Sequence, residues 1–592
     1  MKPEQVLAQT FGYSQFRPGQ KEAVQTLCDG HDLLAIMPTG AGKSLCFQVP
    51  ALTFPGITLV ISPLIALMQD QVRSLCANGV PAAYFNRSLN PAQYRKALEN
   101  LRNNQYKIVY AAPERLESPG FLSICKTLPI SMIAVDEAHC ISQWGPEFRP
   151  SYTRIPEFVA QLSTRPILAA FTATATPKVQ QDIMEKLQLH DPRCIRTPFD
   201  RPNLDFSVLT PKNKDATLLQ LVKAQKGAST IIYCASRKAC EEVSQLLNQH
   251  QIQCLPYHAG LPDDLRTRTQ EAFISDRIPT IAATNAFGLG IDKPDVRCVI
   301  HYQMPASLEA YYQEAGRAGR DGQQAQCILL FAPKDIRLQQ FLMENGDHED
   351  DQAHQLRLTQ DRHRLDAMIR YARSTSCLTR QILAYFGQPA DKDCGRCSHC
   401  LHPAASTDVT NAALKLFAAI LRTDARYGTR KLLEIVTAKR TAFIRDNHYD
   451  THPAYGCLKD FPDPQELITQ LLEQGYLQTQ GDYPTLSLTP QAVKAIKEHQ
   501  PIRMHTRTDT LTLHTATDDP LLHTLKNVRR QLAREYHLPP YMIFSDATLK
   551  ELAAKKPLTL QEMLEVSGIG TVKLAKYGDA FLEAIASSTK TT

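Results

Sequence analysis

The chain has 592 residues, of which 43% are hydrophobic and 21% are charged, and its formal net charge is +6. This length exceeds what one hydrophobic core organises, so several domains are expected, and the mild charge means that any nucleic-acid surface is local. The composition excludes a disordered chain, and with no run of about 18 apolar residues and no apolar core in the opening MKPEQVLAQT, we expect a cytoplasmic protein without membrane contact.

Short apolar runs alternate with helical patterns from residue 32 to residue 176. Each run ends in small or polar residues, as strands do when the loops that follow them carry a site. A polar, proline-containing segment, residues 197–214, interrupts the alternation, and similar runs continue to residue 331. The pattern predicts two parallel α/β lobes joined by a linker, with a ligand cleft between them. The runs are DLLAIM, ITLVIS, KIVYAA, SMIAVD, PILAAFTAT, STIIYC, QCLPYHAG, PTIAATN, RCVIHY and QCILLF.

The stretch MPTGAGKS, residues 37–44, follows the first apolar run and opens a helical pattern. Glycines let main-chain amides approach a phosphate, and a helix N-terminus adds positive potential. Lys43 is expected to contact the β- and γ-phosphates and the Ser44 hydroxyl to bind Mg²⁺. Met37 stands where the strict motif has its first glycine. The other predicted nucleotide contacts in this loop are Thr39, Gly40, Ala41 and Gly42.

Two acids and two arginines complete a predicted hydrolytic site. In IAVDEAH, Asp136 ends a buried strand and is predicted to hold Mg²⁺, while Glu137 orients the attacking water. In QEAGRAGRDG of the second lobe, Arg317 and Arg320 are three residues apart, which predicts one helical face. An arginine that reaches across a cleft stabilises charge on a transferring phosphoryl group. Together with the phosphate loop, these residues predict nucleotide hydrolysis.

Four cysteines lie in the spacing C-x16-C-x2-C-x2-C. Four thiolates at such spacings suit a tetrahedral structural zinc with no open position for catalysis. Unlinked thiols and an iron–sulfur cluster are alternatives, and His399 and His402 are nearby alternative ligands. The cysteines are Cys377, Cys394, Cys397 and Cys400.

The remainder of the chain predicts two smaller domains. Helical patterns from residue 407 end in YLQTQGDYPTLSLT, two alternating runs around a Gly-Asp turn that predict the β-hairpin of a winged-helix domain. Arg430, Lys431 and Lys439 would contact duplex phosphates there, or form an ordinary solvated face. A threonine-rich linker then precedes a segment that is helical throughout, from residue 518.

The chain resembles the RecQ family of superfamily 2 DNA helicases over essentially its whole length. The matching stretches are FGYSQFRPGQ, MPTGAGKS, ISPLIALMQDQV, APERL, DEAHCISQWGPEFRP, FTATAT, YHAGL, TNAFGLGIDKPDVRCVIH and QEAGRAGRDG. In this superfamily the first glycine of the phosphate loop is often absent, which accounts for Met37. The resemblance implies an α/β fold of two RecA-like lobes, residues 1–200 and 201–345, then a helical zinc-binding domain (346–406), a winged-helix RQC domain (407–505), a linker (506–517) and an all-helical HRDC domain (518–592).

The resemblance also implies roles that the patterns alone do not supply. Gln20 would read the adenine edge beside Arg17, Gln313 would lie near the γ-phosphate, and Asp292 would help to close the nucleotide site. It favours all four cysteines as the zinc ligands. Tyr483, at the tip of the predicted hairpin, is a candidate wedge between DNA strands.

A loop of residues 143–149, here called the aromatic-rich loop, follows the two acids and contains the single tryptophan of the chain. The resemblance implies that it contacts single-stranded DNA and signals to the ATP site. Aromatic faces stack on any base for about 1–3 kcal/mol each, so the loop can couple DNA to hydrolysis. Pro146 and Glu147 replace the histidine and aspartate usual in the family, and we expect coupling of altered strength. The implied contacts are Gln143, Trp144, Phe148 and Arg149.

These features predict an ATP- and Mg²⁺-dependent DNA helicase with a structural Zn²⁺. The resemblance alone implies 3′-to-5′ movement on single-stranded DNA, unwinding of duplex or branched DNA, roles in recombination, repair and replication restart, a nucleoid location, and partners such as single-strand-binding or other repair proteins. Two alternatives are an RNA helicase, which the DEAH letters suggest, and a DNA-binding scaffold with an inactive motor, which the intact Lys43, Asp136 and Glu137 disfavour. The HRDC-like domain is expected to bind DNA or protein.

Overall fold

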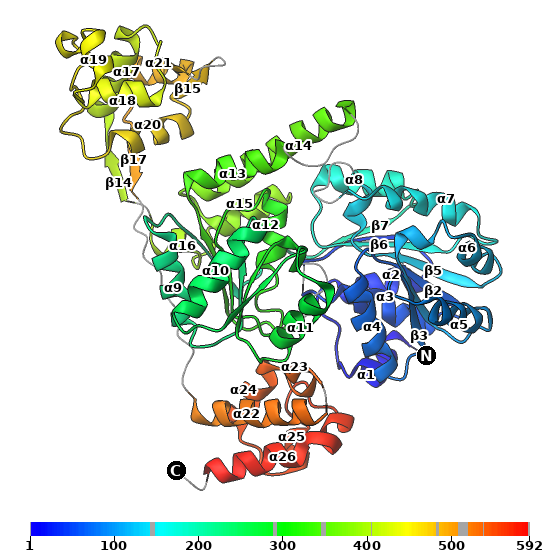
Figure 1. Cartoon of the computed structure of the whole chain (residues 1–592). Helices are drawn as coiled ribbons and strands as arrows, with labels where there is room; N and C mark the ends of the chain where they lie inside the picture. The colour runs from blue at the N-terminus through cyan, green and yellow to red at the C-terminus, as the bar shows by residue number, and fades with distance from the viewer. Residues whose placement is uncertain are drawn as a thin grey trace. The chain divides into compact units, whose positions relative to one another are not determined.

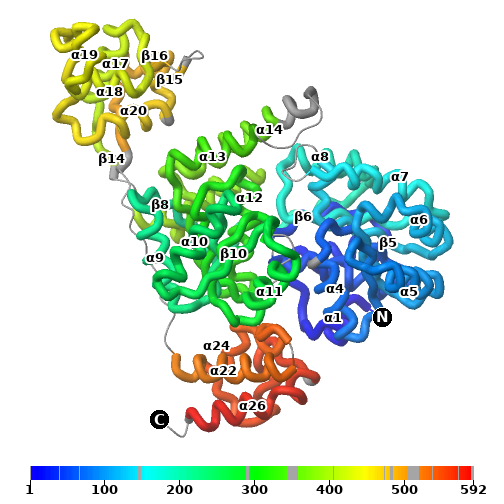
Figure 2. Tube along the Cα trace, viewed as in Figure 1, coloured from blue at the N-terminus to red at the C-terminus, as the bar shows by residue number. Residues whose placement is uncertain are grey.

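A computed structural model gives the fold, and the chain divides into two compact units, Met1–Leu401 with Leu511–Thr592, and His402–Thr510. The first unit contains both α/β lobes, the zinc-binding segment and the C-terminal helices, and the second is the winged-helix domain (Figures 1 and 2). Within the described residues, no helix combines the length and apolar character needed to cross a bilayer. The described residues are 2–38, 40–142, 148–287, 293–344, 351–403, 405–480, 485–506, 519–536 and 538–589.

Lobe 1 is built on a seven-stranded sheet in the order β3-β4-β2-β5-β6-β1-β7, and every pairing is parallel. Helices cover both faces (Figure 1), so the central strands are continuous apolar runs. The five strands predicted for this lobe are confirmed, and β3 (Ala82–Phe85) and the polar edge strand β7 (Arg193–Arg196) were missed. The other bounds are β1 Leu33–Ile36, β2 Ile57–Ile61, β4 Ile108–Ala111, β5 Ile130–Val135, β6 Ile167–Thr172, α1 Pro3–Phe11, α2 Gln20–Cys28, α3 Lys43–Thr53, α4 Ile65–Ala77, α5 Pro91–Arg102, α6 Pro119–Cys125, α7 Ile155–Ala160 and α8 Pro177–Lys186, with 3₁₀ turns η1 Pro113–Arg115, η2 Ala138–Ile141 and η3 Pro150–Arg154.

Lobe 2 has a six-stranded parallel sheet in the order β10-β11-β9-β12-β13-β8. The expectation of a linker throughout residues 197–214 is wrong, because β8 (Leu204–Leu209) lies inside it, fully buried and paired with β13. Prolines and charged residues lie on both sides of this short apolar run, so the composition of the segment did not predict a strand there. The other bounds are β9 Thr230–Tyr233, β10 Cys254–Tyr257, β11 Thr280–Ala283, β12 Cys298–His301, β13 Ala325–Leu330, α9 Lys214–Ala224, α10 Arg237–Gln249, α11 Asp263–Ile274, α12 Leu308–Ala315, α13 Pro333–Glu344 and η4 Asn285–Phe287.

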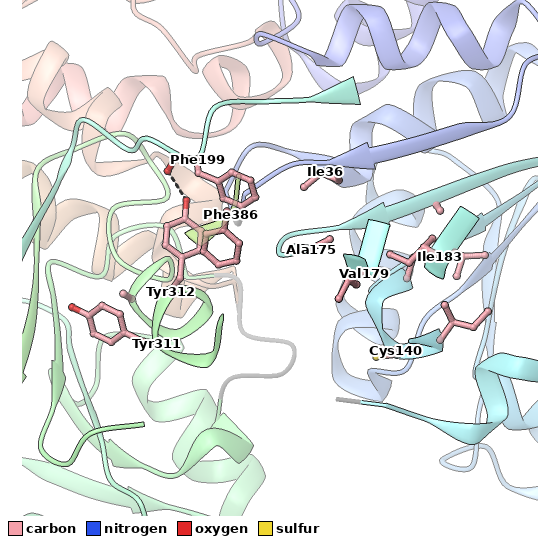
Figure 3. Packing of buried hydrophobic residues seen from close by; sticks show 14 of the residues in the cluster. Ile36, Cys140, Ala175, Val179, Ile183, Phe199, Tyr311, Tyr312 and Phe386 are labelled. Carbon is pink, nitrogen blue, oxygen red and sulfur yellow. Dashed lines mark hydrogen bonds between the residues drawn. The ribbon is translucent and has the colours of Figure 1, made fainter. Parts of the chain in front are cut away.

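The zinc-binding segment packs on the connection between the lobes. Phe386 stacks on Phe199 with ring centroids 4.6 Å apart, and the Tyr312 hydroxyl donates to the Phe199 carbonyl at 2.6 Å (Figure 3). The side chain of Gln388 accepts from the Phe199 amide and donates to the Thr197 carbonyl. This segment therefore braces the point where the chain passes from one lobe to the other. Its helices are α14 Asp351–Arg373, α15 Leu378–Tyr385 and α16 Ser398–Leu401.

The winged-helix unit has its own hydrophobic core. The predicted hairpin is confirmed as β15 (Leu477–Gln480) paired antiparallel with β16 (Thr485–Leu488), and its tip, with Tyr483, lies outside the described residues. Strand β17 (Arg503–Thr506) pairs with β14 (Ala405–Asp408), so Thr506, where the predicted linker begins, is the last residue of a strand. The rest of the predicted linker lies outside the described residues. The helices are α17 Thr410–Arg422, α18 Thr429–Val436, α19 Ala442–Asp446, α20 Pro464–Glu473 and α21 Pro490–Lys497, with η5 Tyr449–Thr451.

The C-terminal domain is all-helical, as predicted, and a buried arginine joins it to lobe 2. Arg529 is 2% exposed, and its Nη1 atom donates to the Phe544 carbonyl at 3.0 Å. Its Nη2 atom lies 3.8 Å from a carboxylate oxygen of Asp276 and 3.7 Å from one of Asp295, both in lobe 2. Nothing in the local pattern of this helix predicts that contact. The helices are α22 Pro520–Glu535, α23 Pro540–Ile543, α24 Asp546–Lys555, α25 Leu560–Met563 and α26 Thr571–Thr589.

Candidate functional site

The phosphate loop lies at the carboxyl end of β1, where ligands bind in open parallel sheets. Gly40 and Gly42 have φ angles of 87° and 81°, in the left-handed region that favours glycine, and Gly42 is the N-cap of α3. Lys43 is the first residue of that helix and Ser44 follows it, so both sit at the positive helix end. The loop therefore has the backbone form that a phosphate requires. Thr39, the other predicted contact, lies outside the described residues.

The two predicted acids follow β5, two strands from β1 in the same sheet. The Asp136 amide donates to the Ile61 carbonyl at 2.8 Å, and the Ser62 hydroxyl donates to an Asp136 carboxylate oxygen at 3.3 Å. The Glu137 Oε2 atom is buried and accepts no hydrogen bond within the described part of the chain. This orphaned oxygen and the clustered carboxylates fit a site for Mg²⁺ and water, and the individual roles stay predictions.

The two arginines of lobe 2 lie beside the phosphate loop of lobe 1. A Cβ atom on Gly40 would be 3.5 Å from Cγ and 3.6 Å from Cα of Arg320. Arg317 is 8% exposed, and both guanidinium groups act electrostatically on Glu137. Gln313 is half-buried on α12. The structure thus brings together the loop, the acids and the arginines that were predicted to share one site.

The expectation that Arg317 and Arg320 share a helical face is wrong. Helix α12 ends at Ala315, and both arginines lie in the turn that follows it. Gly319 has φ +54°, and any Cβ there would lie 2.5 Å from the Asn203 side-chain nitrogen. The helix stops at Ala315 with Gly316 as its C-cap, and contacts with distant residues then shape the turn.

Arg201, which sequence reasoning missed, holds that arginine-carrying turn. Its Nη2 atom donates to the carbonyls of Ala318 at 3.2 Å and Gly319 at 2.9 Å. Asn203 donates to the Gly319 carbonyl at 2.8 Å. The sequence gives one hint of this role, because Arg201 and Asn203 flank a proline directly before a buried strand. Sequence reasoning assigned these residues to the linker instead.

Burial and neighbouring charge move the pKa values of the two acids in opposite directions. Burial, reinforced by the Glu137 charge, raises the pKa of Asp136 to about 6. Burial also acts to raise the pKa of Glu137, but the positive charges of Lys43, His139 and the two arginines outweigh it and lower that pKa. Of the two acids, Asp136 therefore holds a proton more readily and Glu137 ionises more readily.

This asymmetry predicts a pH-dependent stability change for Asp136→Asn. The folded-state pKa of Asp136 is raised, so the stability linked to its protonated form is present below about pH 4 and is lost as pH rises through about 6. Without Mg²⁺ or nucleotide, the variant should gain stability relative to the wild-type protein at pH 8, with the gain shrinking towards pH 5. Denaturant midpoints across this range test it, with the exposed Asp264→Asn as control. A difference independent of pH would contradict the prediction.

Gln20 and Arg17 lie against the phosphate loop rather than pointing away from the protein. Gln20 is 2% exposed, and its Nε2 atom donates to the carbonyls of Ala41 at 2.9 Å and Gly42 at 3.1 Å. The Arg17 Nη1 atom donates to the Gly40 carbonyl at 2.7 Å. Both side chains are thus tied to the loop that would bind phosphate, and their predicted contact with adenine stays a prediction. Asp292 lies outside the described residues.

His139 links the acids to a neighbouring strand end, a connection that sequence reasoning did not identify. Its Nδ1 atom is 2.9 Å from the Thr172 hydroxyl and 3.4 Å from Glu137 Oε2. The Thr172 hydroxyl donates to the Thr174 carbonyl at 3.1 Å. The histidine of DEAH and the first threonine of FTATAT are therefore in contact. The sequence offered one hint of this contact, which was that both motifs lie at the ends of predicted strands.

The aromatic-rich loop is partly described. Gln143 and Trp144, with Pro146 and Glu147, lie outside the described residues, whereas Phe148 and Arg149 are half-buried at its C-terminal end. The Arg149 amide donates to the Cys140 carbonyl at 2.9 Å. The base of this loop is therefore attached to η2, directly after the two acids.

The four cysteines form one cluster, whose Sγ atoms all lie within 4.8 Å of one another. Cys394 and Cys400 are separated by 3.8 Å and Cys377 and Cys397 by 4.0 Å. Four thiolates at about 2.3 Å from a tetrahedral zinc are about 3.8 Å apart, so the spacing fits that metal. His399 bonds through Nδ1 to the Ser376 carbonyl at 2.9 Å, and it is not part of this cluster of possible ligands.

Main-chain amides support the thiolates of this cluster. Leu378 donates to the Cys397 sulfur at 3.4 Å, and the Cys394 amide donates to the Cys377 sulfur at 3.3 Å. The hydrogen bond between Cys394 and Cys397 lowers the pKa of the Cys394 thiol and raises the pKa of the Cys397 thiol. Such donors stabilise the deprotonated sulfurs that zinc binds. A metal held by all four cysteines would have no open position for catalysis.

Two parallel lobes that face each other across a phosphate loop, two acids and an arginine-carrying turn define a two-lobed helicase motor. The DEAD/DEAH box helicase model matches residues 17–183, and the helicase conserved C-terminal domain matches residues 213–322. Three further models match in chain order: RecQ zinc-binding at 333–401, RQC at 403–512 and HRDC at 518–585.

Proteins of known name are similar along nearly the whole chain. The ATP-dependent DNA helicase RecQ of Bacillus subtilis is 38% identical over 99% of this chain and 98% of its own length. The ATP-dependent DNA helicase RecQ of Pasteurella multocida is 37% identical over 98% of this chain and 93% of its own length. A protein of Acanthamoeba polyphaga mimivirus named putative ATP-dependent RNA helicase R290 is 35% identical over 81% of this chain and 88% of its own length. The chain belongs to the RecQ family of ATP-dependent DNA helicases. Its cofactors are Mg²⁺ with ATP and a structural Zn²⁺.

Proposed function

We propose that this helicase moves 3′ to 5′ on single-stranded DNA and separates duplex or branched DNA in recombination, repair and replication restart. The observation that carries the proposal is the approach of the Arg320 backbone to Gly40, which places the arginine turn of lobe 2 at the phosphate loop of lobe 1. A nucleotide bound there contacts both lobes, so binding and hydrolysis alternately join and release them.

Each residue of the site has a proposed task. Lys43 neutralises the β- and γ-phosphates, and Ser44 and Asp136 hold Mg²⁺, which supplies charge neutralisation when bound. Glu137 orients the attacking water, and its lowered pKa keeps it ionised for that purpose. Arg317 and Arg320 stabilise charge on the transferring phosphoryl group, with Gln313 nearby.

The remaining proposals concern DNA and partner proteins. Gln143, Trp144, Phe148 and Arg149 contact single-stranded DNA, because aromatic faces and a cation suit stacked bases and phosphates. The winged-helix domain contacts duplex DNA, with Tyr483 as the wedge, and the HRDC domain binds DNA or a protein. Single-strand-binding and other repair proteins are the proposed partners, and the proposed location is the nucleoid in the cytoplasm.

Strand displacement tests the direction of movement. Duplexes with a 3′ or a 5′ single-stranded tail are incubated with the protein, with and without ATP. We expect ATP-dependent release from the 3′-tailed substrate and background release from the 5′-tailed one. The reverse preference would overturn the polarity. A second measurement compares how strongly single-stranded DNA and RNA of the same sequence stimulate ATP hydrolysis. We expect greater stimulation by DNA, and greater stimulation by RNA would contradict the proposal.

A further inference from the structure

The two ends of the aromatic-rich loop are tied to the acids by separate contacts. On one side, η2 follows Glu137 directly, and the Cys140 amide donates to the Glu137 carbonyl at 2.9 Å. On the other side, η3 begins after Arg149, and Tyr152 lies within it. The Tyr152 hydroxyl donates to the main-chain carbonyl of Asp136 at 2.9 Å. A residue beyond the loop thus contacts the peptide group that joins the two acids.

Tyr152 is held rigidly by the lobe core. Its side chain is 0% exposed and belongs to the same hydrophobic cluster as Cys140, Ile141 and Ile155. Buried rings in such a core adopt one packed position, so the hydroxyl has little freedom to find another partner. The main-chain amide of Tyr152 also donates to the Arg149 carbonyl at 3.0 Å, which connects the backbone of this residue to the end of the loop.

The peptide that Tyr152 contacts is followed by an unusual backbone conformation. Glu137 has φ 47° and ψ 47°, a left-handed conformation that a residue with a Cβ atom rarely adopts. Such a conformation persists when the surrounding contacts hold it. Here the Ile61 carbonyl accepts from the Asp136 amide, Cys140 donates to Glu137, and Tyr152 donates to the Asp136 carbonyl. Of these three contacts, the one from Tyr152 comes from beyond the loop.

We propose that Tyr152 is a positioning residue that holds the peptide bond between Asp136 and Glu137, and so passes the position of the aromatic-rich loop to the Glu137 carboxylate. DNA that holds the loop also holds η3, which follows the loop directly. The tyrosine hydroxyl then keeps the Asp136–Glu137 peptide in the orientation seen here, which sets the direction of the Glu137 side chain. The inference rests on the proposed function, because it assumes that DNA bound at the loop stimulates hydrolysis.

Tyr152→Phe tests the proposal, because it keeps the packed ring and removes the hydroxyl. One hydrogen bond changes an equilibrium by about two- to tenfold, so kcat for ATP with saturating single-stranded DNA should fall by that factor. The KM for ATP and the DNA concentration for half-maximal stimulation should stay within about twofold, since no contact to either ligand is removed. The matched control is Tyr110→Phe, in strand β4 of the same lobe. Tyr110 is 2% exposed and its hydroxyl accepts from Gln48, and the kcat of this variant should not change.

Hydrogen exchange of the wild-type protein tests the link independently of any variant. Addition of single-stranded DNA should change exchange in residues 136–141 and 148–154 together. A change confined to 148–154, or an unchanged kcat in a folded Tyr152→Phe, overturns the role of Tyr152. A wild-type protein without any DNA stimulation overturns the proposed coupling itself, which is a different failure.

Discussion

Lys43→Ala is expected to reduce ATP turnover by at least about 10²-fold at saturating single-stranded DNA, which is the scale for loss of one preorganised charge-stabilising group. Lys43 begins α3 directly after the two left-handed glycines, and its charge acts on both acids, lowering the pKa of Asp136 and of Glu137. Its removal would therefore delete the proposed phosphate contact and also favour protonation of the two carboxylates that are proposed to hold the metal and the water.

The control for this experiment is Lys21→Ala, whose side chain is 73% exposed, and it should hydrolyse ATP normally. A phosphate-release assay gives the rate, and binding of a fluorescent ATP analogue separates lost affinity from lost chemistry. Lys43→Arg, which keeps the charge on a differently shaped head, should recover binding better than turnover. Turnover by Lys43→Ala within about tenfold of wild type would contradict the assigned phosphate site.

Cys397→Ser is expected to lose the zinc and to unfold the zinc-binding segment. Cys397 is fully buried, and its sulfur lies 3.4 Å from that of Cys400. Structural zinc contributes about 10–16 kcal/mol in small zinc domains, more than a segment of this size gains from its own core. Because the segment stacks Phe386 on Phe199 at the connection between the lobes, unwinding should fall together with stability.

Metal content and thermal melting measure both consequences. The wild-type protein should contain one zinc per chain and should lose stability when a strong chelator removes it, even with Mg²⁺ restored. Cys76→Ser is the control, because Cys76 is an exposed free thiol outside the cluster, and it should retain both zinc and melting temperature. A Cys397→Ser protein with full zinc content and wild-type melting would show that this cysteine is not a ligand.

Local chemistry explains which parts of the site could be predicted. Glycines that permit left-handed backbone, a lysine at a helix start and acids after a buried run are defined by neighbours in the chain, so the phosphate loop and Asp136 with Glu137 were recognisable. The cysteine spacing was equally local, but it left His399 open as an alternative ligand, and only the fold shows the four sulfur atoms gathered without it.

Contacts between distant residues explain what could not be predicted. The helical face expected for Arg317 and Arg320 is a turn, because Arg201 holds its carbonyls from more than a hundred residues away. The Tyr152 hydroxyl and the Asp136 carbonyl are joined by packing of the core, which no spacing rule encodes.

Residue type and short-range backbone preference were enough to recognise a phosphate loop, paired acids and a four-cysteine cluster, whereas the identities of the domains came from the resemblance to a known family. The fold showed how these parts lie against one another, from the arginine turn at Gly40 to Arg529 near two lobe 2 carboxylates. Burial and charge depend on which surfaces meet, and the local pattern of a chain leaves that choice open.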